Sequence, residues 1–345
     1  MAYSTITKSS TYMNTKLYTG TGSSNAITGV GHQPDLTWIK QRNETRNHAW
    51  FDAVRGATKL ISSSSNGNES TQSNGLTAFG ADGFTVVSHD DVNKNSGTYV
   101  SFNWKANGAG SANTDGDINT IATSVNSTAK FSISRYVGTG NNGDKFGHGL
   151  GVTPDVVLVK STNDNTDWRM YHKDIPSANT RAIRLNNNDY WNTSAGYWSN
   201  TSPTSSLVCL GNDSTVNQNG NYYVAYCWKS VVGFSKFGSY TGNGNANGTF
   251  IYTGFKPKFL MVKNASASAN WVIVDSERLG YNPNNSELFA NTTDDEEANN
   301  QIDLLSNGFK MRANSTSINT SGSQYIYLAW GQSLVGSNNV ANTAR

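Results

Sequence analysis

The stretch "YTGTGSSNAITGVGHQPDLTWIK" (residues 18–40) has two counterparts later in the same chain. They are "YVGTGNNGDKFGHGLGVTPDVVLVK" (136–160) and "YTGNGNANGTFIYTGFKPKFLMVK" (240–263). Every copy has two glycines after its first tyrosine and ends on a lysine that follows a proline by six residues. Similarity of a chain to itself in a fixed order is the signature of repeated structural units. The sequence therefore predicts three homologous units.

Two further blocks follow each copy in the same order. The second block begins at Trp50, Trp168 and Trp271, and we align these three tryptophans with one another. The third block is "YVSFNWKA", "YVAYCWKS" and "YIYLAWGQ", ending at residues 106, 230 and 332. We divide the chain into an N-terminal arm (1–16), a first repeat (17–106), a linker (107–130), a second repeat (131–232) and a third repeat with a short C-terminal tail (233–345). The linker is rich in Gly, Ala, Asn and Ser, a composition typical of flexible or surface-draped segments.

The residue pattern of each unit indicates β-structure. In the third block Val100, Phe102 and Trp104 alternate with other residues, as in a strand with one buried face. The apolar runs that begin at a proline are typical of strands, because proline cannot donate to a ladder and sits naturally at a strand's first residue. Many short strands and polar turns predict an all-β protein of three tandem jelly-roll-like (lectin-like) β-sandwich domains. Placed in a row, they would make an elongated molecule.

Composition excludes several classes of protein. Charged residues make up 14% of the chain and the net charge is +2, without the clusters of Lys and Arg that nucleic-acid binding needs. No apolar run is long enough to span a membrane, and the first residues lack the apolar core of a signal peptide, so we expect synthesis in a cytoplasm. Cys209 and Cys227 are expected to be buried thiols rather than a disulfide.

No pattern for catalysis or metal binding emerges. "GTGNNG" (138–143) matches a dinucleotide fingerprint, but a strand rather than a helix is expected after it, so we interpret it as a turn. The chain has no nucleophile elbow, no compact group of carboxylates and no zinc-type spacing of Cys or His, so we expect no catalytic residues, no metal site and no cofactor. Calcium is the one option left open, because "DDVNKNSG" (90–97) and "NDNTD" (163–167) alternate oxygen side chains, although both lack the closing Glu.

The three units differ most in the segments 62–75, 186–200 and 291–301, and divergent loops on a shared scaffold are a common way to diversify binding. The second of these segments is unusually aromatic and forms a candidate glycan-stacking loop. Its candidate residues are Tyr190, Trp191, Tyr197 and Trp198 for stacking and Asn186, Asn187 and Asp189 for hydrogen bonds. The alternative is that these rings pack against the adjoining unit or another subunit.

The combination "YTGTG…GHQPDLTWIKQR…DAVRGATK…DGFTV…YVSFNWKA" resembles the repeat of structural proteins in tailed bacteriophages, especially those of marine cyanobacteria, often described as tail-fibre or virion proteins. The resemblance covers all three units and is strongest in the first. Unit two lacks a "VRGATK" equivalent, and unit three keeps "NGF" (307–309) in place of "DGF" (82–84).

This resemblance implies a non-enzymatic virion protein, assembled in the host cytoplasm and displayed on the particle. It also implies other virion proteins and a host-surface glycan as partners, and a homo-oligomer such as a trimer, with no nucleic acid and no membrane insertion. A tail fibre or similar appendage for host attachment is our first expectation. Capsid decoration is the alternative, since residues 1–16 are too few for a separate tail-anchoring domain. A carbohydrate-active depolymerase is the rival of another class and would need paired carboxylates in one cleft.

Overall fold

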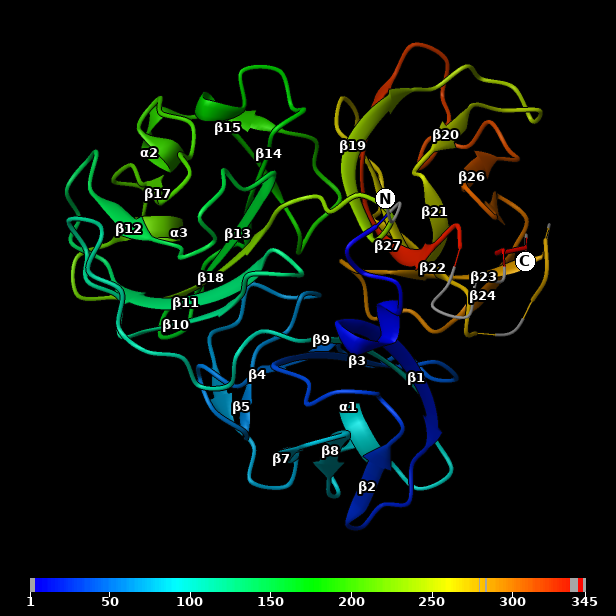
Figure 1. Ribbon diagram of the computed structural model, residues 1–345, viewed down its shortest axis with the longest axis horizontal. Coiled ribbons are helices and arrows are strands. Elements are labelled where there is room, and N and C mark those ends of the chain that lie inside the picture. Colours follow the sequence, from blue (N-terminus) through cyan, green and yellow to red (C-terminus); the bar gives the residue numbers. More distant parts are fainter. Residues whose placement is uncertain (1–3, 279, 283, 336–340, 344–345) are drawn as a thin grey trace.

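Three lobes, one for each repeat, surround a common centre (Figure 1). This computed structural model describes residues 4–278, 280–282, 284–335 and 341–343. The protein is all-β, as predicted, and its strands pair antiparallel within several sheets, an arrangement consistent with β-sandwiches.

Unit one holds a four-stranded sheet, a three-stranded sheet and a two-stranded ribbon. In sheet order they are β1 (Met13–Thr19), β9 (Thr98–Trp104), β3 (Leu36–Gln41) and β4 (Ala49–Asp52); β2 (Asn25–Thr28), β8 (Gly83–Val86) and β7 (Leu76–Gly80); and β5 (Lys59–Leu60) with β6 (Ser70–Thr71). Two short helices belong to this part of the chain, η1 (Ser9–Thr11) and α1 (Asp90–Asn93).

Units two and three repeat this strand order with variations. Unit two has β10 (Ala122–Asn126), β11 (Phe131–Val137), β18 (Tyr222–Trp228), β13 (Val156–Ser161), β14 (Arg169–His172), β15 (Arg181–Arg184) and β16 (Asn192–Thr193); β12 (Lys145–Gly147) with β17 (Leu207–Cys209); and the helices η2 (Ala178–Thr180), α2 (Ala195–Trp198) and α3 (Ser214–Asn217). Unit three has β19 (Ser235–Thr241), β27 (Gln324–Ser333), β21 (Phe255–Asn264), β22 (Val272–Asp275), β23 (Asn285–Phe289) and β24 (Glu297–Asn299); and β20 (Phe250–Tyr252), β26 (Gly308–Met311) and β25 (Ile302–Leu305).

The expected strands are confirmed. The third blocks form β9, β18 and β27, and the apolar runs form β3, β13 and β21 inside the same sheets. No proline is the first residue of its strand: β3 and β13 begin two residues after Pro34 and Pro154, and β21 contains Pro257 at a shift of register. The tryptophan alignment of the second block is wrong by two residues. Register pairs Trp38 with Trp50 and Leu158 with Met170, so Trp50 corresponds to Met170, and His48 corresponds to Trp168. By the same register Trp271 is the third member of the His48 set.

An elongated row of sandwiches is not what forms, because the three units share one apolar core. Trp330 of unit three meets Trp104 of unit one and Trp228 of unit two, with ring centroids 5.3 and 6.0 Å apart. The main sheet of unit one has two apolar faces. Ile39 and Tyr99 lie in a cluster within the unit, whereas Trp38, Phe102 and Trp104 lie in the cluster that joins all three units. The alternation found in the sequence marks the face turned to the common centre.

Two segments at the edges of the repeats are more ordered than their composition suggests. Residues 107–130 are not a free linker, because β10 extends the sheet of unit two and Ile118 is buried. The sequence pattern does not predict this short strand, because most of its residues are Thr, Ser and Asn. The N-terminal arm ends at β1 rather than at residue 16, and its described part lies where units two and three meet: Ser4 donates to the Val232 carbonyl of unit two and Ser9 to Gln332 Oε1 of unit three.

The opening turn of each unit is held by one buried asparagine. Asn217 donates from Nδ2 to the carbonyls of Asn141 and Gly211 at 2.9 Å each and accepts at Oδ1 from the amide of Thr139. Asn93 and Asn319 make the equivalent contacts in the other units. A Cβ on the first glycine of each pair would lie 2.2–2.3 Å from a carbonyl oxygen, so only glycine fits there. The interpretation of "GTGNNG" as a turn is confirmed, since it connects β11 and β12.

The units dock on one another in a closed cycle through equivalent ring nitrogens. Trp168 Nε1 of unit two donates to the Ser62 carbonyl of unit one, and Trp271 Nε1 of unit three donates to the Arg184 carbonyl of unit two, both at 2.8 Å. His48 closes the cycle. Its Nδ1 accepts from Trp38, so its Nε2 carries the hydrogen and donates to the Phe289 carbonyl of unit three at 2.9 Å.

The lysine that ends each copy of the opening stretch strengthens the same interfaces. Each ammonium is fully buried and donates to a carbonyl of the neighbouring unit. The pairs are Lys40 with Thr293 at 3.2 Å, Lys160 with Asn66 at 3.4 Å, and Lys263 with Asn188 at 3.1 Å. A buried ammonium is costly unless its hydrogens are bonded, so each lysine requires the neighbouring loop to be in place.

Replacing Asn217 by alanine is expected to lower the free energy of unfolding by about 3 kcal/mol, because it leaves buried carbonyl and amide groups without partners. Urea unfolding followed by tryptophan fluorescence measures this loss. Asn219→Ala, at an exposed position in the adjacent turn, is the matched control and should change stability little. Equal stability of the two variants would contradict the role of the amide.

The buried lysines predict a pH dependence of stability. Burial lowers the pKa of Lys40 and Lys160 to about 8 and that of Lys263 to about 7. From about pH 7 to about pH 9 the unfolded chain holds protons that the folded chain has released, so the free energy of unfolding should rise with pH, by up to about 1.4 kcal/mol per pH unit and group. Lys263→Met should flatten this rise, whereas Lys8→Met, at an exposed position, should not.

Candidate functional site

Each of the three divergent segments takes part in an interface between two units. Equivalent backbone bonds run from Glu69 to Thr162, from Trp191 to Ala265 and from Glu296 to Arg42, each joining a divergent segment to the next unit. Part of each divergent segment therefore packs against another unit. What remains for binding is the portion that faces away from the interface.

Two of the four candidate rings in the segment 186–200 are buried. Trp198 is 1% exposed and donates from Nε1 to the Arg181 carbonyl at 2.8 Å. Tyr197 is 4% exposed, its hydroxyl accepts from Asn192 Nδ2, and the Arg169 guanidinium lies 4.6 Å from its ring centroid. Both rings are held by unit two itself, because the short helix α2 turns them inward.

The other two rings border an open groove. Tyr190 is 48% exposed, and the half-buried Trp191 lies at 85° to it with ring centroids 6.0 Å apart. The Arg181 guanidinium covers Trp191 at 3.6 Å from the ring centroid, which holds the indole in place. The groove has a volume of about 430 Å³ and is lined by Arg184, Asp189, Tyr190, Trp191, Asn192 and Thr193.

The polar groups of the groove are arranged in one hydrogen-bonded set. Arg184 is ion-paired with Asp167 and with Asp189, each at 3.1 Å. Asn187 donates to Asp189 Oδ2 at 3.0 Å, and its own side-chain oxygen accepts from the Asp189 amide. The candidate residue Asn186 instead donates to Asp167 and accepts from the backbone amide of Trp168. One guanidinium between two carboxylates leaves the groove without an excess positive charge.

Units one and three have a buried ion network at the position where unit two has the groove. In unit one Arg55 Nε contacts Asp52 at 2.5 Å and Nη1 contacts Glu69 at 3.1 Å. Unit three repeats the network with Asp275, Arg278 and Glu296. At the equivalent positions, unit two has His172, Ile175 and Trp191, and the residue that closes the network elsewhere is the ring of the groove.

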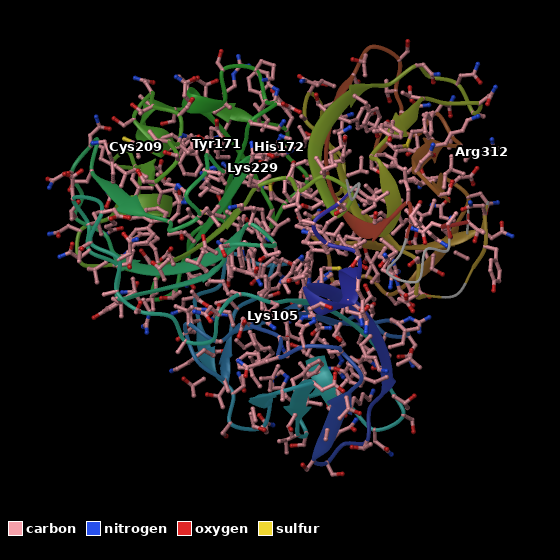
Figure 2. The ribbon with its side chains drawn as sticks, in the orientation of Figure 1. Lys105, Tyr171, His172, Cys209, Lys229 and Arg312 are labelled. Carbon is pink, nitrogen blue, oxygen red and sulfur yellow. The ribbon has the colours of Figure 1, made fainter. Side chains whose placement is uncertain are left out.

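Burial keeps the substituted histidine neutral. His172 is fully buried on β14, and this burial lowers its pKa to about 4. Figure 2 places it on the side of the second lobe that faces the third lobe. A neutral imidazole needs no guanidinium partner. This explains why unit two can have Ile175 at the position of the arginine and Trp191 at the position of the glutamate. In the sequence, the replacement of the network is visible as the missing "VRGATK" element of unit two. The shifted tryptophan alignment did not show that Trp191 stands at the position of the glutamate.

The remaining features of the described residues concern metal binding, the two cysteines and membrane-spanning helices. Among the described residues no group of three or more His, Cys, Asp or Glu side chains is placed to hold a metal ion. The segment 90–97 instead contributes Asn93 to the turn described above. Cys209 and Cys227 are free buried thiols, as expected. Within the ranges described, the structure has no helix with the length and apolar character that crossing a membrane requires.

Comparisons with known proteins give a family but no function. Neither the curated proteins nor the solved structures compared with this chain gave a match. The profile of one protein family, described as a domain of unknown function (DUF7483), matches residues 8–333. This match runs from the N-terminal arm to the last strand of unit three, so it treats the closed cycle of three units as one domain. The chain belongs to the DUF7483 family.

Proposed function

We propose that this chain is a non-enzymatic structural protein of a tailed-phage virion, displayed on the particle as a tail fibre or similar appendage that attaches to a host-surface glycan. The observation that carries the attachment role is the groove of unit two, where Tyr190 and Trp191 stand at the place of a buried ion network. Its partners in this proposal are other virion proteins, further copies of the chain and the glycan. Each unit is proposed to be a jelly-roll-like, lectin-like sandwich.

The chemistry of the groove suits an uncharged sugar. A sugar ring presents an apolar face of C–H groups, which packs on an aromatic ring, and an edge of hydroxyls, which exchange hydrogen bonds with amides and carboxylates. The exposed Tyr190 supplies the ring, Asp189 and Thr193 of the lining supply polar groups, and Asn187 holds Asp189 in place. The volume of about 430 Å³ lies within the range of small-molecule sites.

The arrangement of carboxylates supports binding over hydrolysis. A glycosidase needs two carboxyl groups that face each other across the bond to be cleaved. Among the residues that line the groove Asp189 is the one carboxylate, and it is ion-paired with Arg184. A paired carboxylate is a poor general acid, so we propose a binding protein rather than a depolymerase.

Capsid decoration is the second candidate, and the compact shape of the chain favours it. The expectation of a fibre used the idea of sandwiches in a row, whereas the three lobes close around one core (Figure 1). A compact three-lobed body suits a fixed position on a shell at least as well as a place on a fibre. The two candidates differ in location and share the non-enzymatic, structural character.

The groove predicts a specific loss of glycan binding. On a glycan array, Tyr190→Ala with Trp191→Ala should weaken binding about tenfold or more, because the stacking surface is removed. Tyr222→Ala is the matched control, since Tyr222 is 40% exposed on another part of unit two. The single variant Tyr190→Ala controls for misfolding of the double variant, because it leaves the contact between Arg181 and Trp191 intact. Unchanged binding by the single and the double variant would exclude the groove.

The location of the protein on the particle separates the two candidates. Antibodies raised against the purified chain, attached to gold and viewed on intact particles, should label the tail or its appendages. Label spread over the head would reject the appendage and select capsid decoration. Label absent from particles of a phage that encodes the chain would reject both.

A further inference from the structure

We propose that the outer sheet of unit three carries a second binding surface, and that its ligand is an acidic glycan. This surface, here named the outer platform, consists of Phe250, Tyr252, Lys236, Lys310 and Arg312. It shares no residue with the groove of unit two. Figure 2 shows Arg312 on the outer side of the third lobe, away from the shared core.

Two aromatic rings point outward from the short strand β20. Phe250 and Tyr252 are 46% and 49% exposed, whereas Ile251 between them is buried. The period-two pleat of a strand sends alternate side chains to opposite faces, so the buried isoleucine fixes both rings on the solvent side. Rings that are nearly half exposed contribute little to the core and mark a candidate interaction surface.

The fold itself does not require rings at these positions. Register equates Ile251 with Ile27 of unit one and with Phe146 of unit two. The residues on either side are Ala26 and Thr28 in unit one and Lys145 and Gly147 in unit two. Two of the three copies of the scaffold therefore carry small, polar or charged residues there, and only unit three carries the aromatic pair.

Positive charge surrounds these rings. Lys310 is the cross-strand partner of Phe250 on β26, and the exposed Arg312 comes directly after that strand. Lys236 Nζ lies 5.7 Å from the Tyr252 ring centroid and donates to the Tyr252 carbonyl at 2.7 Å. The nearby carboxylate Asp303 is 14% exposed and is ion-paired with Arg312. In the described part of the chain neither Lys236 nor Lys310 takes part in an ion pair, so the platform keeps an excess of positive charge.

The combination of rings and ammonium groups selects the class of ligand, since Lys310 and Lys236 donate to the neutral oxygens of Asn247 and Tyr252 and keep their charge uncompensated. An acidic sugar offers both a C–H face for the rings and a carboxylate or sulfate for the lysines. Single-stranded nucleic acid also stacks on aromatic rings, but its binding sites are basic grooves that track several phosphates. Here Lys310 lies on the outer sheet and Lys236 on the adjacent strand β19, both beside the two rings, in a chain whose net charge is only +2, which favours the glycan.

Direct binding to defined oligosaccharides tests the platform. The full chain is titrated by calorimetry with oligomers of polygalacturonate, with dextran oligomers of equal length as the neutral probe and with oligothymidylate as the nucleic-acid probe. The wild type should bind polygalacturonate at least about tenfold more tightly than dextran, and added salt should weaken this binding by screening. Absence of polygalacturonate binding, equal affinity for dextran, or tighter binding of oligothymidylate would overturn the proposal.

Variants locate the binding on the platform. Phe250→Ala with Tyr252→Thr gives unit three the residues that unit one carries, so the strand should remain folded, and affinity for polygalacturonate should fall about tenfold. Lys310→Gln should lower the affinity and reduce its salt dependence. Tyr190→Ala with Trp191→Ala should leave polygalacturonate binding intact, so a failure of the groove and a failure of the platform give different results. Wild-type affinity in the Phe250 and Tyr252 variant would reject the platform.

Discussion

The structure depends on a hydrogen bond that each unit donates from a buried ring nitrogen to a backbone carbonyl of its neighbour. Trp168, Trp271 and His48 occupy the same position in their units, and their acceptors Ser62, Arg184 and Phe289 also occupy equivalent positions. A lysine ammonium beside each ring bonds a second carbonyl of the same neighbouring loop. Because unit one binds unit three, unit two binds unit one and unit three binds unit two, the contacts close and leave no unit with an unused interface.

This closure explains why the divergent segments are not free loops. Each begins at an acceptor carbonyl or two residues after it, and a backbone bond from its middle reaches a neighbouring unit, so docking constrains part of the segment. In units one and three the segment also supplies the glutamate of a buried Asp–Arg–Glu network. Unit two replaces the network by a neutral histidine, an isoleucine and Trp191, and thereby gains a groove. Interface and candidate site are thus two uses of one segment.

The sequence predicted the repeats, the strands and the all-β class because these depend on local patterns: glycine turns, prolines before strands and alternation of apolar residues. It could not show which apolar face meets which partner, since Trp38 and Ile39 differ only in the side of the sheet to which they point. The alignment matched Trp50 with Trp168 and Trp271 because all three are tryptophans. The residue of unit one that is equivalent to Trp168 and Trp271 is His48. The buried Asn93, Asn217 and Asn319 were visible as an asparagine after Val or Ile in each unit, but hydrogen bonds to a turn about 70 residues away leave no local pattern.

Closure of the cycle also has a consequence for synthesis on the ribosome. The face of unit one that carries Trp38 and Trp104 is covered by Phe259 and Trp330, residues of the last unit to be translated. Until that unit emerges, the first two units expose large aromatic side chains to solvent, and transiently exposed apolar surface favours aggregation. The nascent chain therefore passes through a vulnerable stage that ends only when the third unit is complete, and molecular chaperones would be needed most during that interval.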